Sequence, residues 1–420
     1  MKIVVIGSGL IGLTCAYVLR RQGHEITVID RAEGAGRETS FANGALLTPS
    51  MSDPWNAPGC WRTLLGSLGR SDSALQLRLR ALPSVASWGV TFLRNSGAAE
   101  FERNTRSNLR LGLYSLNVLQ RLRQETGIEY GRSARGSLKI FRDHASLDRA
   151  CVTATRLQSD GLRFRRLSRD EAIEVEPALG PIASRLAGGI HYDADETGDA
   201  YRFCVALAEH SRHDGVEFRF RTEVTALETR SGNVTAVVCG RERFIADQYV
   251  LAAASYSTPL LRRVGVHLPV QPAKGYSITF DDRQGKPSLS LPVVDDALHA
   301  VIVPLQGAIR VAGTAEFAGF DQTLNQKRIR NLRKLIQDVL PRGAFDPETA
   351  RPWCGLRAMS ADGVPIIGPT PVSNLLVNSG HGHLGWTTAA GSAQLLAALI
   401  SGDSPAIDPA PYALGRFGPA

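Results

Sequence analysis

The sequence predicts an α/β protein: a discontinuous, doubly wound parallel sheet joined to an α+β domain with a mixed or antiparallel sheet. Three observations support this fold class. A strand–glycine loop–helix–strand unit opens the chain, a strand–glycine loop–helix unit closes it, and alternating strand patterns fill residues 268–317. The length of 420 residues suits two interleaved domains. We place the first domain at 1–50, 185–265 and 350–420, and the second at 51–184 and 266–349.

The N-terminal unit has the pattern of a dinucleotide-binding βαβ motif. Residues 2–6 (KIVVI) are a short apolar run typical of a buried strand, and residues 10–23 have helical apolar spacing. In the loop between them, the three glycines of G-x-G-x-x-G permit a tight turn, close approach of a pyrophosphate and close packing of the helix. The next strand, 25–30, ends in an acid that can bind ribose hydroxyls and disfavours NADP. The cofactor-binding residues expected here are Gly7, Ser8, Gly9, Leu10, Ile11, Gly12, Asp30 and Arg31.

The C-terminal unit has the same glycine spacing, at Gly380, Gly382 and Gly385, within residues 374–402. A second dinucleotide site would need a further strand that ends in an acid, but the last 18 residues contain four prolines and no strand pattern. The loop instead leaves backbone N–H groups at a helix N-terminus, where a negative charge is stabilised. A reduced flavin carries such a charge, whereas a nicotinamide does not, so the motif favours FAD over NAD. The alternative is a plain strand-to-helix connection in which glycine permits tight packing.

The segments between these units are expected to complete both domains. Residues 31–50 form a small-residue loop that suits a bound diphosphate, and residues 74–126 have helical periodicity, with an amphipathic face over 106–127. Strands are expected within 216–254. Further helices are expected at 145–161, 168–179, 197–215 and 323–340.

Composition excludes several classes of protein. The six cysteines contain no C-x-x-C and are irregularly spaced, so we expect no metal site, no disulfide framework and a cytoplasmic location. The net charge of +8 comes from dispersed arginines without a recognisable nucleic-acid motif, so no nucleic acid is expected; peripheral contact with the inner face of the cell membrane stays open. Residues 363–402 contain no charged residue, but prolines and polar residues interrupt them, which indicates a buried core segment rather than a membrane helix.

Several segments together resemble the bacterial D-amino acid dehydrogenase small-subunit family and, more widely, the D-amino acid oxidase and glycine oxidase superfamily. They are VVIGSGLIGLTCAYVLRRQGHEITVID, ETSFANG, PWNAPG, RVAGTAEFAGF, WCGLRAMSADGVPIIGPT and NSGHGHLGWTTAAGSAQLLAALISG. The resemblance implies a two-domain flavoprotein with a doubly wound FAD-binding domain and a substrate domain. It implies oxidation of the Cα–N bond of an amino acid to an imine, which water converts to a 2-oxo acid and ammonia. In the dehydrogenases, electrons pass to a quinone chain instead of oxygen.

The resemblance also implies roles for individual residues. Arg357 should hold the substrate carboxylate, a role that its charged, planar fork suits; the alternative is a structural arginine. Tyr276 and His383 are candidates to tune or deprotonate the substrate amine, although packing roles are the alternative. Val224 should lie near the adenine and Ala253 near the diphosphate. Cofactor contacts are further expected from Ser40, Asn43, Gly44 and Ala45, and flavin-ring contacts from Gly382, Leu384, Gly385 and Thr387.

One segment departs from the family pattern. Residues 44–55 (GALLTPSMSDPW) are more apolar than that pattern, and this loop borders the substrate. The departure puts a broad D-alanine preference in doubt and admits a cyclic or bulkier amine, such as a D-proline derivative. Two other functions stay open: an oxygen-using glycine or sarcosine-type amine oxidase, and a non-catalytic flavin-binding subunit of a larger dehydrogenase complex.

Overall fold

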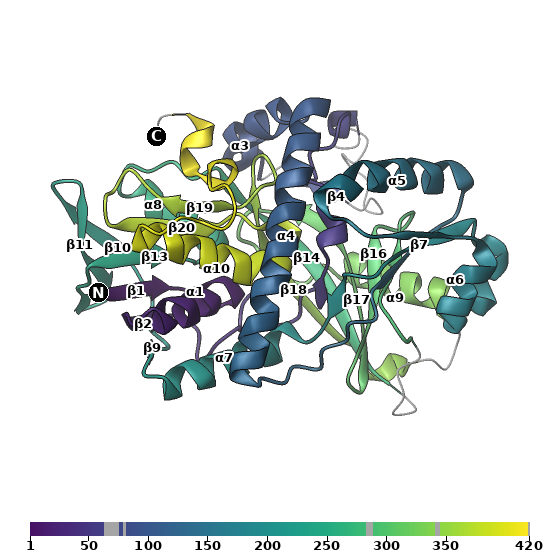
Figure 1. Ribbon diagram of the computed structural model, residues 1–420, viewed down its shortest axis with the longest axis horizontal. Coiled ribbons are helices and arrows are strands. Elements are labelled where there is room, and N and C mark those ends of the chain that lie inside the picture. Colours follow the sequence, from purple (N-terminus) through teal and green to yellow (C-terminus); the bar gives the residue numbers. More distant parts are fainter. Residues whose placement is uncertain (63–74, 79–80, 283–288, 341–344, 419–420) are drawn as a thin grey trace.

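The computed structural model describes residues 1–62, 75–78, 81–282, 289–340 and 345–418. A six-stranded sheet lies at one end of the molecule, with strand order β19-β20-β13-β1-β2-β9 (Figure 1). Its strands are β1 (Lys2–Ile6), β2 (Glu25–Ile29), β9 (Glu217–Arg219), β13 (Gln248–Leu251), β19 (Ile366–Pro369) and β20 (Leu375–Ser379). All neighbours are parallel except β19 and β20. The N-terminus, the middle and the C-terminus of the chain thus supply one sheet, as the sequence predicts.

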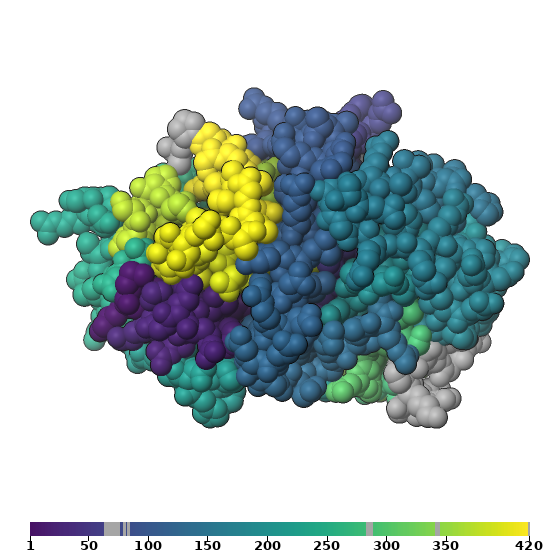
Figure 2. Space-filling view, in the orientation of Figure 1, coloured from purple at the N-terminus to yellow at the C-terminus, as the bar shows by residue number. Residues whose placement is uncertain are grey.

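Helices α1 (Leu10–Arg21) and α10 (Gly385–Ser401) lie side by side on this sheet, and α4 (Ala98–Thr126) crosses next to α10 (Figure 1). The Thr14 hydroxyl of α1 donates a hydrogen bond to the Ala389 carbonyl of α10 at 3.2 Å. On the other side of α10, the Gly391 N–H donates to the Ser115 hydroxyl of α4 at 3.0 Å. Figure 2 shows that α4 and its neighbours close this face of the molecule. The two glycine loops therefore lie at the N-termini of two helices that pack together.

A nine-stranded mixed sheet forms the other half, with β18-β14-β17-β16-β15-β5-β7-β6 in order and β4 paired with β17. Its strands are β4 (Leu75–Leu77), β5 (Ser137–Phe141), β6 (Arg165–Leu167), β7 (Gly188–Tyr192), β14 (Val270–Asp281), β15 (Val293–Asp295), β16 (Ala300–Leu305), β17 (Ala308–Phe317) and β18 (Arg351–Ser360). Most pairs are antiparallel; β15 with β5 and β17 with β4 are parallel. Helix α9 (Gln326–Val339) packs its apolar face on β14 and β17.

The remaining elements connect or cover these sheets. The helices are α3 (Leu82–Arg94), α5 (His144–Leu157), α6 (Arg169–Val175), α7 (Ala200–His213) and α8 (Ser257–Arg262). A three-stranded antiparallel sheet contains β10 (Ala226–Arg230), β11 (Asn233–Cys239) and β12 (Glu242–Phe244), and β3 (Leu46–Leu47) pairs with β8 (Glu196–Thr197). Among the described residues, no helix is long and apolar enough to span a bilayer.

Three predicted boundaries differ from the structure. β7 and β18 belong to the nine-stranded sheet, although ranges 185–265 and 350–420 assigned them to the other domain. Both strands have runs of consecutive buried residues, so their sequences lack the alternation that would show which sheet they join. Within the predicted helical range 74–126, residues 75–77 form β4, because they pair with the edge of β17.

Candidate active site

A large cavity lies where the two sheets meet. Its volume is about 1170 Å³, and it is lined by the loops after β1 and β13 together with residues of β14, β17 and β18. Pockets for a single small molecule occupy about 300–1,000 Å³. The cavity is therefore large enough for a dinucleotide cofactor together with a small substrate.

The first glycine loop forms one end of this cavity. Gly7 has φ +110°, and a Cβ added there would lie 2.6 Å from the Ala252 carbonyl oxygen. A Cβ at Gly12 would lie only 1.9 Å from the Gly7 carbonyl oxygen, so helix and strand meet in backbone contact. Gly9 caps α1 without a side chain, and the Ser40 hydroxyl accepts the Leu10 N–H at 3.2 Å. The other N–H groups of the first turn have no partner within the helix, which fits a phosphate group.

Asp30 is fixed in position beside this loop. Its Oδ2 accepts hydrogen bonds from the Ser8 N–H at 2.6 Å and the Ser8 hydroxyl at 2.7 Å. Next to it, the Arg31 guanidinium stacks over the Tyr256 ring at 3.9 Å and pairs with Glu38. Asp30, Arg31 and Tyr256 all line the cavity together with Val224. This end therefore offers acceptors for ribose hydroxyls and a planar aromatic surface.

The second glycine loop borders the same cavity. A 3₁₀ turn, Gly382–Leu384, leads directly into α10, and Gly382 has φ +57°. Gly382, His383 and Gly385 line the cavity. Leu384 and Thr387, predicted at the flavin ring, do not: Leu384 packs in the core, and the Thr387 hydroxyl accepts the Thr48 N–H at 2.9 Å.

Of the remaining predicted cofactor residues, most line the cavity. They are Gly7, Gly9, Leu10, Ile11, Ser40, Asn43, Gly44, Ala45 and Ala253. Ser8 and Gly12 do not line it, because Ser8 holds Asp30 and Gly12 packs against Gly7. These two residues shape the loop from behind.

Arg357 lies in the cavity wall on β18. Its Nη1 donates to the Thr314 carbonyl at 3.3 Å, and its guanidinium lies 5.7 Å from the centre of the Trp55 ring. Burial lowers the pKa of Arg357 to about 10, so it stays charged at neutral pH. No carboxylate among the described residues lies within ion-pair distance of it. A buried cation without a counterion is costly, so this site is suited to an anionic ligand.

Some residues around Arg357 were not predicted from sequence. The guanidinium lies across Gly275, where an added Cβ would be 2.2 Å from Nη1. Thr314, which supplies the carbonyl, has φ +57°, an uncommon backbone conformation that often occurs at functional sites. Trp55 stacks on His383 with ring centroids 5.8 Å apart. Trp55 and Thr314 lie in segments that resemble the family, PWNAPG and RVAGTAEFAGF, so the sequence could have indicated them. Gly275 lies outside those segments.

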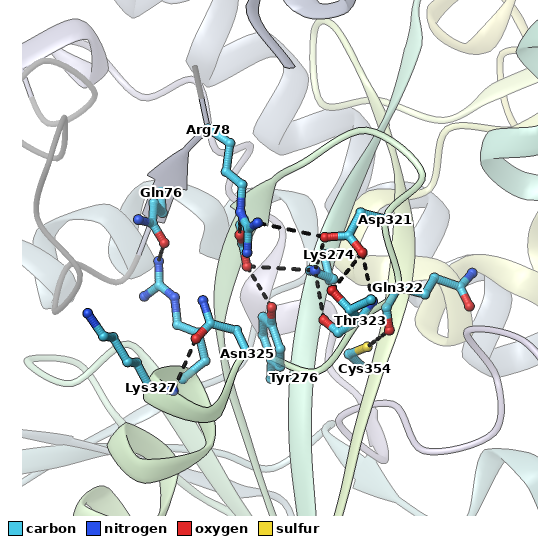
Figure 3. A network of polar contacts seen from close by, with 12 residues as sticks. Gln76, Arg78, Lys274, Tyr276, Asp321, Gln322, Thr323, Asn325, Lys327 and Cys354 are labelled. Atoms are coloured by element: carbon cyan, nitrogen blue, oxygen red, sulfur yellow. Dashed lines mark hydrogen bonds and ion pairs between the residues drawn. The ribbon is translucent and has the colours of Figure 1, made fainter. Parts of the chain in front are cut away.

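Tyr276 lies at the cavity, but its hydroxyl is bonded elsewhere. Its hydroxyl donates to the Glu316 carboxylate at 2.5 Å, within a network of polar side chains (Figure 3). Glu316 also pairs with Arg78 and lies 3.9 Å from Lys274, which bonds to Asp321 at 3.2 Å. Burial raises the pKa of the Tyr276 phenol, and the Glu316 hydrogen bond raises it further. The ring lines the cavity, but the hydroxyl is engaged in this network rather than free for an amine.

His383 is brought to the site as predicted. Its Nε2 lies 2.9 Å from the Met51 carbonyl, which can only accept, so Nε2 carries the proton. Burial lowers the pKa of His383 to about 4, so the ring is neutral at neutral pH. His383 is therefore a polar wall residue and a weak base.

Comparison with known proteins identifies the family. The family model described as "DAO: FAD dependent oxidoreductase" matches residues 2–399. The chain belongs to this family. Among DAO-family relatives, the D-amino acid dehydrogenase of Paramagnetospirillum magneticum is 41% identical over 420 residues, covering 99% of both chains. The D-amino acid dehydrogenase of Sinorhizobium medicae is 40% identical over 418 residues, covering 100% of both.

Solved structures show the same DAO-family fold. Glycine oxidase from Geobacillus kaustophilus superposes with a TM-score of 0.78 at 22% identity, covering 99% of each chain. L-Proline dehydrogenase from P. horikoshii gives a TM-score of 0.77 at 17% identity, covering 99% of this chain and 98% of the other. The predicted α/β fold and FAD as cofactor are thereby confirmed. A cavity with two glycine loops, a fixed ribose acceptor and unpartnered helix N–H groups fits FAD.

Proposed function

We propose that this DAO-family enzyme oxidises the Cα–N bond of a D-amino acid. The product imine is hydrolysed by water to a 2-oxo acid and ammonia. The observation that carries this proposal is the buried Arg357 guanidinium, which has no carboxylate partner in the described part of the chain. An amino acid carboxylate would supply the missing charge through two parallel hydrogen bonds. The D-configuration follows the names of the two bacterial relatives.

FAD would bind along the whole cavity. The α1 N-terminus and Gly9 would hold the diphosphate, and Asp30 the ribose, with Val224 on the adenine side. The α10 N-terminus, from Gly382 to Gly385, would face the isoalloxazine. When bound, FAD accepts the hydride from the substrate Cα and the flavin then passes the electrons on.

The protein residues then have binding and orienting roles. Arg357 fixes the substrate carboxylate, and the Trp55 ring covers the guanidinium and restricts access of water. His383 is neutral, so it does not repel a protonated amine. Its Nε2–H donates a hydrogen bond to the Met51 carbonyl. In this proposal the amine proton passes to water, because the Tyr276 hydroxyl is bonded to Glu316 and the His383 ring is a weak base.

The electron acceptor is proposed from the same relationship. We propose a quinone-type acceptor at the membrane surface, which the resemblance to the dehydrogenase family implies. The likeness to glycine oxidase in three dimensions favours oxygen as the second candidate. A stopped-flow experiment distinguishes the two acceptors. The flavin is reduced anaerobically with a D-amino acid, and its reoxidation is then followed after mixing with oxygen or with a soluble quinone. Reoxidation that is faster with the quinone supports the dehydrogenase.

Arg357→Met tests the proposal. We expect KM for a D-amino acid to rise about 100-fold, since losing a buried charge-pair partner costs about 2–5 kcal/mol, while FAD stays bound. Arg351→Met is the matched control, because Arg351 is exposed at the start of the same strand and pairs with Asp281. Unchanged kinetics in Arg357→Met would contradict the role of this residue. Failure of any D-amino acid to bleach the wild-type flavin would contradict the proposed reaction.

A further inference from the structure

A second cavity adjoins the large one. Its volume is about 390 Å³, and it extends from the large cavity toward α5. The two cavities share six wall residues: Met51, Trp55, Lys139, Val294, Asp296 and His383. Its own walls are mainly polar, with the hydroxyls of Ser50, Ser137, Ser146, Thr153 and Tyr192. The second cavity is thus a polar side chamber of the active site.

The side chamber begins next to the proposed carboxylate site. The Trp55 ring has Arg357 at 5.7 Å and stacks on His383 at 5.8 Å. Trp55 and His383 both belong to the shared wall. A substrate held by its carboxylate on Arg357 therefore has the mouth of the chamber within reach of its side chain.

Two cations and two carboxylates line the chamber, and only one cation and one carboxylate form an ion pair with each other. Lys139 is neutralised by Asp296, with Nζ and Oδ1 2.7 Å apart. Arg149 is exposed at the outer end and bonds to the Ser146 hydroxyl at 2.8 Å. Asp53 has no cation within ion-pair distance among the described residues; its one hydrogen bond is a long one, 3.4 Å, from the Thr105 hydroxyl. Among the described residues, Asp53 therefore lines the chamber without an ion-pair partner, as Arg149 does at the outer end.

The surroundings of Asp53 agree with an open binding position. Asp53 is solvent-exposed and is one of the residues that line the chamber. Desolvation raises the pKa of the Asp53 carboxyl, and Lys139 and Thr105 only partly oppose that shift. A cation bound in the chamber would remove this cost.

We propose that the side chamber binds the side chain of a cationic D-amino acid, with Asp53 as the acceptor of its terminal guanidinium or ammonium group. This inference rests on the proposed function and specifies its substrate class. Arg357 and Asp53 would then bind the two ends of one substrate, the carboxylate and the side-chain cation. Asp53 is a specificity residue, since it lies away from the reacting Cα.

The kinetic test compares Asp53→Asn with wild type on four substrates. D-Arginine and D-lysine carry the cation, D-norleucine has the length of lysine without the charge, and D-alanine does not reach the chamber. We expect kcat/KM for the two cationic substrates to fall about 10–100-fold in the variant, as for loss of a charged hydrogen bond, and to change less than about 2-fold for the other two. Asp148→Asn is the matched control, because Asp148 is an exposed acid of α5 outside the chamber.

A binding test needs no turnover. 4-Guanidinobutanoate and butanoate both carry a carboxylate but lack the amine that is oxidised, and each is titrated into the holoenzyme by calorimetry. We expect the guanidino compound to bind wild type at least about 10-fold more tightly, and this advantage to disappear in Asp53→Asn. An equal loss on D-alanine and D-arginine, or an advantage that survives in Asp53→Asn, would overturn the inference. If D-alanine but not D-arginine bleaches the flavin, the inference about the side chamber is wrong while the proposed reaction stands. If no D-amino acid bleaches the flavin, the proposed reaction is wrong, and the calorimetric titration still tests cation binding at Asp53.

Discussion

The two glycine loops have the same spacing but different physical requirements. In the first, Gly12 is required by the protein itself, since a Cβ there would lie 1.9 Å from the Gly7 carbonyl oxygen. In the second, the corresponding Gly385 has helical φ −53°, and an added Cβ would meet nothing closer than the His381 Cβ at 3.8 Å. The first loop uses its third glycine to pack a helix on a strand. In the second loop the third glycine lines the cavity, so we infer that its missing side chain leaves room for a ligand there.

The largest expected effect comes from Gly12→Ala. The added methyl cannot fit without separating α1 from β1, so we expect destabilisation of more than about 3 kcal/mol and little soluble protein. Soluble yield and thermal unfolding by circular dichroism measure it. Gly89→Ala is the control, because Gly89 lies within α3 with nothing within 4 Å of the added Cβ. A Gly12→Ala protein that melts within about 2 °C of wild type would contradict the packing role.

This contrast also shows what the sequence could predict. The first loop was predictable because all its determinants, from β1 to Asp30, lie within thirty residues and follow local rules. The role of Tyr276 was not, since its partner Glu316 lies 40 residues away on a neighbouring strand. The sheet assignments of β7 and β18 depend likewise on long-range pairing.

Arg357 lies between these cases. A motif resemblance pointed to it, but only the structure shows that no carboxylate among the described residues pairs with it. Arg310, by contrast, is buried at 5% exposure and approaches Asp199 at 3.8 Å, with hydrogen bonds to Thr279 and the Asn43 carbonyl. Among so many arginines, the missing partner is what distinguishes a ligand-binding side chain from a structural one, and sequence spacing does not report it.

The two loops also differ in the pH dependence of their contribution to stability, and this expected effect is smaller. The second loop carries His381 and His383, whereas the first carries no histidine. Burial lowers their pKa values to about 3 and about 4, while an unfolded histidine titrates near 6.5. Between these values the unfolded chain binds more protons than the folded one, so stability is lost as pH falls below about 6.5.

His381 should dominate this loss, because it is 6% exposed and burial lowers its pKa further than that of His383. Its contribution is about 1.4 kcal/mol for each pH unit within that window. Urea unfolding at pH 7.0 and 5.0 measures it: His381→Gln should lose less stability between these values than wild type. Equal losses in both proteins would show that His381 is protonated in the folded state.

The smallest effect is expected from Gly385→Ala, and it tests the comparison most directly. In the apo-protein the new methyl has room, and alanine favours a helix over glycine, so stability should rise by up to about 1 kcal/mol. Gly89→Ala gives the same helical gain away from the cavity. If the α10 N-terminus approaches the flavin, the methyl intrudes on it, and the Kd for FAD should rise several-fold in Gly385→Ala alone, as measured by quenching of FAD fluorescence. An unchanged Kd would make the second loop a simple strand-to-helix connection, and its glycine spacing would then be a coincidence of packing rather than a feature of cofactor binding.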